Sequence, residues 1–332
     1  MRSSGLSAWS PVGETISFGA RLSTAFETYG QLCVGIDPHP YLLNSWGLGD
    51  SAASLREFGL RVVDAAAGRA GIIKPQVAFF ERFGSAGYAA LEDVLAAARA
   101  TDLIVIADVK RGDVGTSVEA YADAWLTPGS ALEVDAMTIS AFQGVGSIEA
   151  PMRLADSNGK GLFVLAATSN PEAFAVQTAT ISHGDDIGLS VASTIVKSVG
   201  KWNATQGPRV MKRESGFDEN DTVRARRPQL ASIGVVLGAT VDFAAFGIDL
   251  ATDTVAGAGV QGVDRVDYVL MTPILGPGFG HQGAQFSDLA SLYGAAAPSV
   301  IVSASRSILQ AGPVAIEDAV SRQAAEVMAC RG

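Results

Sequence analysis

The chain has 332 residues, of which 48% are hydrophobic and 17% are charged, and its formal net charge is −10. This composition predicts a large hydrophobic core and excludes a disordered chain. The acidic balance argues against nucleic acid or an anionic membrane surface as a partner, and it leaves open a locally basic pocket for a phosphate.

Cysteine usage and hydropathy indicate the compartment. The two cysteines, Cys33 and Cys330, are too few for a disulfide framework. The N-terminal region shows no apolar signal segment followed by a cleavage site, and no apolar run is long enough to span a membrane. We therefore expect a soluble cytoplasmic protein without a membrane partner.

Short apolar runs rich in Val, Ile and Leu recur along the chain, with Ala-rich amphipathic stretches between them. Near-continuous apolar runs are typical of parallel strands that are buried on both faces. We expect eight strands, within residues 31–38, 71–80, 102–110, 134–140, 161–170, 231–240, 267–275 and 298–307. Alternation of eight strands with helices predicts an α/β fold, a single (β/α)8 barrel, with a doubly wound sheet as the alternative.

Two segments fall outside the repeating pattern. Residues 1–30 are expected to form an N-terminal extension, and residues 31–332 the catalytic barrel domain. Within that domain, residues 201–229 are charged and poor in large apolar side chains, which predicts a surface insertion. Its RARRP segment is interpreted as a solvated loop rather than a binding site.

Polar side chains close most of the expected strands. These residues are Asp37, Lys74, Asp108, Lys110, Thr168, Ser169 and Arg306. Barrel enzymes gather their chemistry at the C-terminal ends of several strands, so this placement favours the barrel. An alternative explanation is that strands end in polar residues because the loops that follow are exposed to solvent. This explains any one of these residues, but it does not explain charged residues inside the strand-like runs.

The stretch IVIADVKRGDVGTS, residues 104–117, has the densest charge at a strand end. By strand alternation Asp108 and Lys110 point the same way, and Asp113 follows just past the strand. Lys110 is therefore expected between two carboxylates, with Lys74 on the neighbouring run as a further member. An ammonium so placed stays protonated at pH 7 and is a proton donor to a strongly basic centre such as a carbanion. The alternative is a structural ion-pair network.

The motif DVKRGDVG resembles the Asp-x-Lys-x-x-Asp signature of the orotidine 5′-monophosphate decarboxylase family, in the Lys-Arg-Gly-Asp form of its longer bacterial branch. The resemblance extends from about residue 30 to the C-terminus. It implies a barrel that converts orotidine monophosphate to uridine monophosphate without a metal or an organic cofactor. Lys110 would be the proton donor, Asp108 would face the carboxylate of the substrate, and Lys74 would complete the charge array and touch the ribose.

The resemblance also implies further contacts to the nucleotide. Asp37, in VGIDP, would bind ribose hydroxyls, and Asp113 would reach the ribose in the neighbouring subunit of a homodimer with shared sites. The family usually has Thr nine residues after the first Asp of the signature. Here that place holds Ser117, with Thr116 before it, so either hydroxyl is a candidate for the contact.

The other end of the nucleotide would lie near strands five, seven and eight. Ser169, in ATSNP, resembles the serine that reads the pyrimidine amide, although a helix cap or turn is an alternative. The stretch GPGFGHQG, residues 276–283, fits a dinucleotide pattern, but no acid ends the next strand. A glycine-rich loop followed by Arg306 instead fits a barrel phosphate site. Gln282 and Arg306 match the phosphate ligands of the family, and Pro277 would line the pocket.

Other chemistries find less support. The three histidines, His39, His183 and His281, are far apart in the sequence and form no ligand pair, so no metal site is predicted. No Gly-x-Ser-x-Gly stands at a strand–helix turn. Two alternatives stay open: a metal-dependent sugar-phosphate decarboxylase or lyase on the same barrel, and a phospho-ligand-binding barrel or oxidoreductase that uses the glycine loops.

Overall fold

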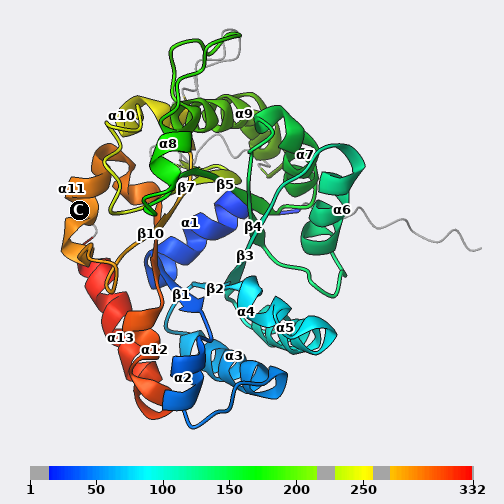
Figure 1. Cartoon of the computed structure of the whole chain (residues 1–332), viewed down its shortest axis with the longest axis vertical. Coiled ribbons are helices and arrows are strands. Elements are labelled where there is room, and N and C mark those ends of the chain that lie inside the picture. Colours follow the sequence, from blue (N-terminus) through cyan, green and yellow to red (C-terminus); the bar gives the residue numbers. More distant parts are fainter. Residues whose placement is uncertain (1–14, 215–228, 257–269, 331–332) are drawn as a thin grey trace, which may run out of the picture.

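The computed structural model describes residues 15–214, 229–256 and 270–330, and eight parallel strands in it close into a barrel (Figure 1). The strands are β1 (Leu32–Ile36), β2 (Ile72–Pro75), β3 (Ile104–Arg111), β4 (Ala136–Ile139), β5 (Gly161–Ala167), β7 (Ile233–Leu237), β10 (Ile274–Pro277) and β11 (Val300–Ala304). Each pairs with the next, and β11 pairs with β1 through Leu32 and Val302. The predicted barrel is therefore confirmed, and the doubly wound sheet is excluded.

Helices surround the barrel. The longer ones are α3 (Ala52–Ala66), α5 (Gly84–Arg99), α6 (Gly115–Leu126), α7 (Glu149–Ser157), α9 (Val191–Glu214) and α13 (Gly312–Ala329). Shorter ones are α2 (Pro40–Ser45), α4 (Val77–Glu81), α8 (Ala173–Gln177), α10 (Leu250–Asp253), α11 (Leu289–Tyr293) and α12 (Arg306–Leu309), and 3₁₀ turns span Val145–Ile148, Phe286–Asp288 and Gly294–Ser299. The helix α3 illustrates why they form: Ser51 caps its N-terminus, and Leu55, Phe58 and Val62 bury one face.

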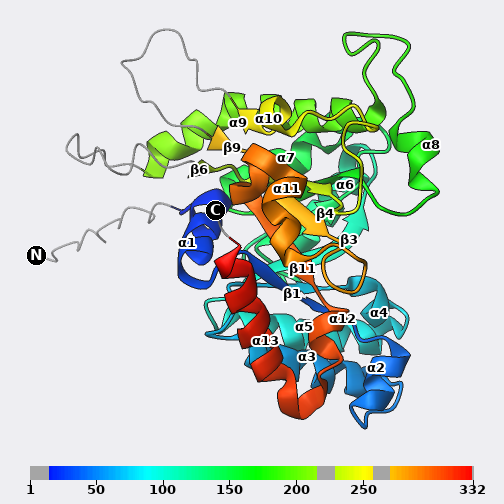
Figure 2. The same ribbon diagram turned by 90° about the vertical axis from the view of Figure 1, so that its left-hand side faces the viewer.

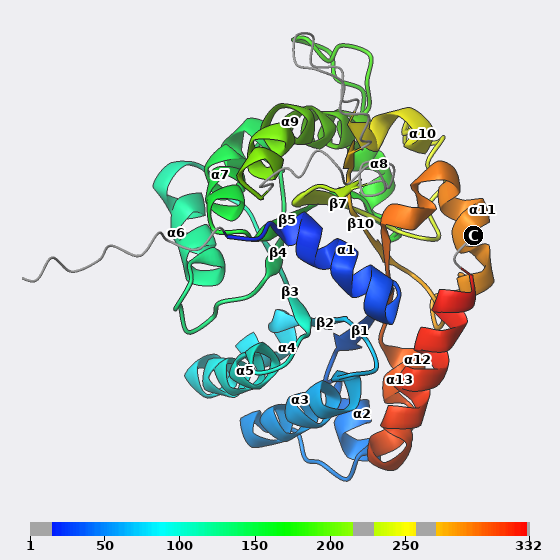
Figure 3. The same cartoon turned by 180° about the vertical axis from the view of Figure 1, so that it is seen from behind.

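The N-terminal extension supplies helix α1 (Phe18–Tyr29), which crosses one end of the barrel (Figures 1 and 3). Its buried side chains Phe18, Leu22 and Phe26 recur at the spacing of one helical face and pack on residues from the barrel interior. The Phe18 ring meets the ring of Phe163 edge to face, with centroids 5.9 Å apart. Gly161 leaves room for this contact, because a Cβ there would lie 2.5 Å from the Phe18 ring. The helix α1 thus covers the N-terminal ends of the strands.

The opposite end of the barrel carries the C-terminal ends of the strands. Figure 2 shows α1 on one side of the molecule, and α2, α4 and α8, which follow β1, β2 and β5, on the other. Parallel strands bring all their C-terminal residues to this one end, so the expected polar side chains share it.

The seventh expected strand differs from the expectation in its bounds. Leu270–Met271 forms β9, which pairs with β6 (Gln229–Leu230) and β8 (Val255–Ala256) in a separate three-stranded sheet. The barrel strand begins only at Ile274. The break falls at Pro273, which has no N–H for a strand ladder, although its carbonyl accepts from Val235 N at 2.9 Å.

The expected insertion at 201–229 is helical in its first part, because α9 continues to Glu214. Trp202 donates through Nε1 to Asp156 Oδ2 at 3.0 Å, and buried Asn203 donates through Nδ2 to the carbonyl of Ile233 at 2.8 Å. These contacts attach the start of the segment to the barrel. Residues 215–228, with the RARRP segment, lie outside the described residues.

Within the described residues, no helix has the length and apolar character needed to cross a membrane. Both cysteines are free thiols, and burial raises the pKa of Cys33 to about 12.

Candidate active site

Three charged side chains meet at the C-terminal end of β2 and β3. Lys74 Nζ donates to Asp108 Oδ2 at 3.0 Å, and Lys110 Nζ donates to Asp108 Oδ1 at 2.5 Å. The side chains of Lys74 and Asp108 are 9% and 11% exposed, whereas that of Lys110 is 47% exposed. The sequence-based expectation that these three residues form one cluster agrees with the geometry.

The centre of the cluster differs from the expectation. Asp108 lies between two ammonium groups, whereas the sequence argument placed Lys110 between two carboxylates. In the described structure, the Asp113 carboxylate accepts from the backbone N–H of Val114 at 2.8 Å. The expected contact of Lys110 with Asp108 is present, and the difference lies in Asp113, which follows a backbone that leaves regular strand geometry: Lys110 has φ of 48° and the pairing with β4 shifts register between Ala107 and Arg111.

The charges of the cluster hold one another ionised. Burial alone would raise the pKa of Asp108, but the charges and hydrogen bonds of Lys74 and Lys110 outweigh it and hold this pKa well below its usual range. Burial alone would lower the pKa of Lys74, but the negative charges of Asp108 and Asp37 outweigh it and raise this pKa. At neutral pH the site therefore presents a fixed array of alternating charge.

A further residue, Thr138 on β4, completes the hydrogen bonds of this array. Its hydroxyl donates to Asp108 Oδ1 at 3.0 Å and accepts from the backbone N–H of Lys110 at 2.9 Å. The sequence analysis did not single out Thr138. The available signal was a lone hydroxyl in the apolar run VDAMTIS.

Arg111, the next residue of the motif, does not join the array. Its guanidinium donates to the Glu81 carboxylate, to Tyr88 Oη at 3.3 Å and to the carbonyl of Val109 at 3.1 Å. Glu81 ends α4 and Tyr88 lies on α5, so Arg111 ties the end of β3 to the segment that follows β2. Its role in the described structure is to anchor the strand end.

Beside Lys74, the mouth of β1 carries polar atoms without partners. Among the described residues, the buried Oδ1 of Asp37 and the buried Oγ of Ser305 have no hydrogen-bond partner. Buried polar atoms of this kind are rare and need a partner such as a ligand or water. Asp37 therefore offers an acceptor for hydroxyl groups next to the charge array.

The glycine-rich loop follows β10, and Arg306 follows β11. Because Pro277 and Ser303 are paired across these strands, the loop and the start of α12 lie side by side. The loop is tight: Gly280 N–H donates to the carbonyl of Ala284 at 2.8 Å, and Gly278 has φ of 116°. Only glycine adopts that conformation freely.

Two side chains that the sequence analysis expects at a phosphate, Arg306 and Gln282, lie in this region. Arg306 is partly exposed, and Gln282 is exposed. The Gln282 amide lies close to Gly278: a Cβ added to Gly278 would be 3.6 Å from Gln282 Oε1. Burial lowers the pKa of His39; the negative charge of Asp37 opposes this shift, and the positive charge of Arg306 adds to it. The loop, Gln282 and Arg306 form a polar region at the same end of the barrel as the charge array.

The remaining candidate hydroxyls are exposed. Ser169 follows β5, and its Cβ lies 3.5 Å from the position of a Cβ on Gly238 after β7. Thr116 and Ser117 lie in the first turn of α6, which starts at Gly115 with φ of 57°. Within the described structure neither Thr116 nor Ser117 contacts the charge array. Which of the two hydroxyls contacts the nucleotide therefore stays open.

The histidines are separate from one another in the described structure. His39 packs on the rings of Tyr41 and Phe79, and His183 hydrogen-bonds to Ser182 Oγ. Among the described residues, no group of three or more His, Cys, Asp or Glu side chains lies close enough to hold a metal ion.

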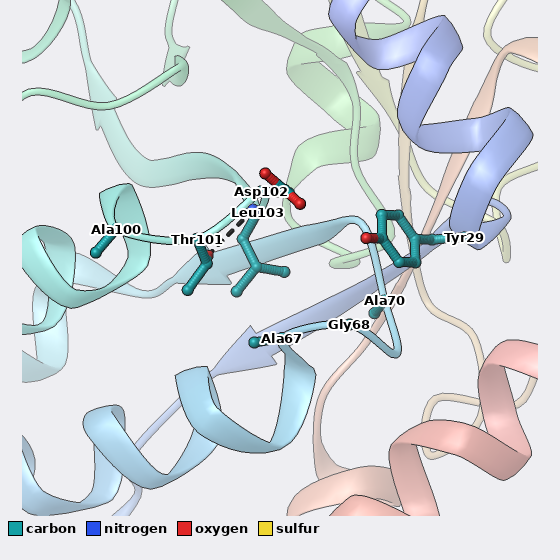
Figure 4. Close-up of a pocket in the computed structure, with 8 residues that line it drawn as sticks. All are labelled: Tyr29, Ala67, Gly68, Ala70, Ala100, Thr101, Asp102 and Leu103. Carbon is teal, nitrogen blue, oxygen red and sulfur yellow. Dashed lines mark hydrogen bonds between the residues drawn. The ribbon is translucent and has the colours of Figure 1, made fainter.

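A small pocket lies at the other end of the barrel (Figure 4). It is lined by Tyr29 of α1, by Ala67, Gly68 and Ala70 before β2, and by residues 100–103 before β3. The N–H of Leu103 donates to Thr101 Oγ1 there at 3.2 Å. This end of a barrel contributes to stability rather than to chemistry, so the pocket is not part of the candidate active site.

Comparison with known protein families identifies the family of this chain. The sequence profile of the orotidine 5′-phosphate decarboxylase / HUMPS family matches residues 30–207, which include all of Lys74, Asp108 and Lys110. The chain belongs to this family. The resemblance expected from the DVKRGDVG motif is thereby confirmed.

Relatives of this family match the chain over nearly its whole length. The orotidine 5′-phosphate decarboxylase of Salinispora tropica is 41% identical over 315 residues, which are 94% of this chain and 98% of the relative. That of Streptomyces coelicolor is 40% identical over 313 residues, 93% of this chain and 96% of the relative.

Solved structures agree as well. A Streptomyces avermitilis protein, described as a candidate orotidine 5′-phosphate decarboxylase, superposes with a TM-score of 0.77 at 39% identity, covering 98% of this chain and 99% of the other. The Leishmania donovani OMP decarboxylase gives 0.66 at 25% identity, covering 95% and 99%. The similarity to this family therefore extends along nearly the whole chain.

Proposed function

We propose that this chain is a carboxy-lyase that converts orotidine 5′-monophosphate to uridine 5′-monophosphate, the last step of de novo pyrimidine nucleotide synthesis. The observation that carries the proposal is the array of Lys74, Asp108 and Lys110 at the C-terminal ends of β2 and β3. Relatives at about 40% identity over nearly the whole chain carry the same activity in their names.

The array suits a reaction in which negative charge moves onto a carbon atom. The bond between C6 of the pyrimidine and the carboxylate breaks, CO₂ leaves without charge, and the electron pair stays on C6. The Lys110 ammonium stabilises the developing carbanion and then gives it a proton. Asp108 faces the departing carboxylate and orients both lysines through its two oxygens. The chemistry needs neither a metal nor an organic cofactor, because protein charges supply the stabilisation.

The rest of the nucleotide is bound by the other residues at this end of the barrel. Asp37 and Lys74 hold the ribose hydroxyls, which supplies the partner that Asp37 Oδ1 lacks in the described structure. Ser169 hydrogen-bonds the pyrimidine amide, and a hydroxyl of Thr116 or Ser117 adds a further contact.

The phosphate is bound at the glycine-rich loop. Backbone N–H groups of the loop, the Gln282 amide and the Arg306 guanidinium hold the dianion, with Pro277 lining the pocket. This arrangement after the seventh and eighth barrel strands is common for phosphates in (β/α)8 barrels.

The active molecule is a homodimer with shared sites. In one copy the Asp113 carboxylate accepts a hydrogen bond from the N–H of Val114 in its own loop. Because Asp113 is partly exposed, its carboxylate can reach the ribose bound by a second copy. Two large apolar side chains flank this region: Val114 is 53% exposed and Phe142, after β4, is 84% exposed. A second copy of the chain would cover both. A cytoplasmic location stays a prediction that cell fractionation tests.

A decarboxylation assay with the pure protein tests the function. We expect the absorbance of orotidine monophosphate to fall when no nicotinamide cofactor is added. We also expect a metal chelator to leave the rate unchanged. Inhibition by the chelator would favour the metal-dependent sugar-phosphate alternative. No turnover of orotidine monophosphate would contradict the proposal.

Replacement of Lys110 tests its proposed role as the proton donor. Lys110→Ala should lower kcat at least about 1,000-fold, equivalent to about 4 kcal/mol of transition-state stabilisation. It should still fold, because the side chain is 47% exposed. Lys197→Ala is the control, since Lys197 on α9 is 43% exposed and its ion-pair partner Asp253 is 4.0 Å away. If Lys110→Ala melts normally and keeps activity within tenfold, Lys110 is not the donor.

A further inference from the structure

The hydroxyl of Thr138 occupies a special place in the charge array. Thr138 lies on β4, is 1% exposed, and contacts two residues of the neighbouring strand β3. A hydroxyl has one proton. Because Thr138 donates that proton to Asp108 Oδ1, its oxygen is free to accept from the backbone N–H of Lys110. One side chain thus joins the Asp108 carboxylate to the backbone of Lys110.

The backbone of Lys110 needs such a contact. Among the described residues, Lys110 is the only one other than glycine with a positive φ, 48°. Side chains other than glycine rarely adopt this conformation, and the surrounding structure must maintain it. The residues that follow are held by separate contacts: Arg111 by Glu81 and Tyr88, and Gly112 by close packing on the carbonyl of Ser140. The N–H of Lys110 itself donates to the Thr138 hydroxyl at 2.9 Å.

We propose that Thr138 is a positioning residue for the decarboxylation, whose hydroxyl holds the Lys110 ammonium and the Asp108 carboxylate in one relative geometry. The inference rests on the proposed function. Thr138 acts through Asp108 and Lys110 and does not itself touch the substrate. Because a misplacement of about 1 Å in a reacting group can cost about 100-fold in rate, the loss should appear in kcat.

The test compares variants that keep or lose the hydroxyl. Thr138→Val has nearly the same shape but no hydroxyl, and we expect kcat to fall about 10- to 100-fold with KM within about threefold. Thr138→Ser keeps the hydroxyl and should retain kcat within about fivefold of the wild type. If Thr138→Val does not fold, Thr138→Ala takes its place, because it also lacks the hydroxyl and adds no bulk.

The matched control is Thr272→Val. Thr272 is equally buried, and its hydroxyl accepts from Asn203 Nδ2 at 3.2 Å outside the charge array. A purely structural role would lower the melting temperature of both Val variants and leave kcat unchanged in both. The proposal is overturned if Thr138→Val, when folded, keeps kcat within threefold of the wild type. It is also overturned if Thr138→Ser is as impaired as Thr138→Val.

A crystal structure of Thr138→Val separates this inference from the proposed function. We expect Lys110 to lose its positive φ or its contact with Asp108. An unchanged Lys110 overturns the positioning role whatever the substrate of the enzyme is. In contrast, a wild-type protein that does not decarboxylate orotidine monophosphate overturns the proposed function alone.

Discussion

At the scale of single residues, the charge array is organised around a carboxylate, Asp108, rather than around Lys110, the proposed proton donor. Asp108 accepts hydrogen bonds from Lys74, Lys110 and Thr138. Three donors and two positive charges keep this buried group ionised, where burial alone would favour its neutral form. Asp108 in turn raises the pKa of Lys74 and accepts hydrogen bonds from both lysines. The position of the Lys110 ammonium therefore depends on Asp108.

The depressed pKa of Asp108 makes the stability of the fold depend on pH. A carboxyl group whose pKa is lower when folded contributes stability above its unfolded pKa of about 3.9 and loses it as pH falls through the folded pKa. We expect Asp108→Asn to lose about 3 kcal/mol of unfolding free energy at pH 7, since it breaks a buried ion pair. The deficit should shrink below about pH 4. Urea unfolding at several pH values measures the deficit in unfolding free energy at pH 7 and its decrease at low pH.

The control for this measurement is Asp93→Asn. Asp93 is 53% exposed and pairs with Arg56 on the surface, so its loss should cost less than about 1 kcal/mol. A deficit of Asp108→Asn that is independent of pH, or a variant more stable than the wild type at pH 7, would show that the array does not stabilise the fold in this way.

The assignment of Arg306 is tested at the same scale. Arg306→Ala should lower kcat/KM about 10- to 100-fold, because a hydrogen bond to a charged group is worth about 1.5–3 kcal/mol. Most of the loss should appear in KM, although remote binding energy also contributes to kcat. Arg61→Ala, at a surface arginine of α3 that pairs with Glu57, is the control. An unchanged kcat/KM for Arg306→Ala would remove Arg306 from the phosphate site.

At the scale of the elements, the two ends of the barrel have different tasks. The helix α1 covers the end where the strands begin, with Phe18, Leu22 and Phe26 buried there. The C-terminal ends of β2 and β3 at the other end carry the charge array, and the glycine-rich loop follows β10 there. Because the barrel interior separates the two ends, stability and chemistry can be changed independently.

Phe18→Ala tests this division. Removing a fully buried Phe should cost about 3–5 kcal/mol of unfolding free energy. Where the variant is still folded, kcat/KM should match the wild type, because Phe18 is at the far end from Lys110. Ile16→Ala is the control, since Ile16 in the same segment is 59% exposed and should cost little. A large loss of kcat/KM in folded Phe18→Ala would mean that α1 affects the site.

At the scale of the whole molecule, the question is whether one chain makes a complete site. In the described structure, Lys74, Asp108 and Lys110 converge, whereas the Asp113 carboxylate bonds to its own loop. A two-fold dimer would bring the same patch of both copies together and let each Asp113 complete the site of its partner. The exposed side chains of Val114 and Phe142 lie in this region.

Mixing inactive variants tests the shared site. Lys110→Ala and Asp113→Ala should each be inactive, and after subunit exchange an equal mixture should regain about a quarter of wild-type activity. Half of the dimers would be mixed, and each would have one site with both defects and one intact site. Lys110→Ala mixed with Lys74→Ala is the control and should regain nothing, because both defects lie in the same chain's array. Failure of the first mixture, or an active monomer in sedimentation, would contradict the dimer.

Residue patterns alone were enough to predict the barrel and the location of its chemistry. Buried parallel strands require apolar runs, so seven of the eight barrel strands could be located from the sequence, whereas the seventh expected run shares only Ile274 and Leu275 with β10. Charged residues at the strand ends could be identified as candidate site residues. The motif around Asp108 and Lys110 also indicated the family. These features are local in the sequence, and each depends only on neighbouring residues.

Other features were decided only by the tertiary structure. The central place of Asp108, the contact of Thr138 and the anchoring of Arg111 by Glu81 join residues about thirty positions apart, and they depend on strand register and on one dihedral angle at Lys110. The covering of one barrel end by α1 and the helical course of residues 201–214 likewise follow from packing between distant segments. Periodicity within a segment carries no information on which distant partner will satisfy a polar group, so only the folded chain reveals these contacts.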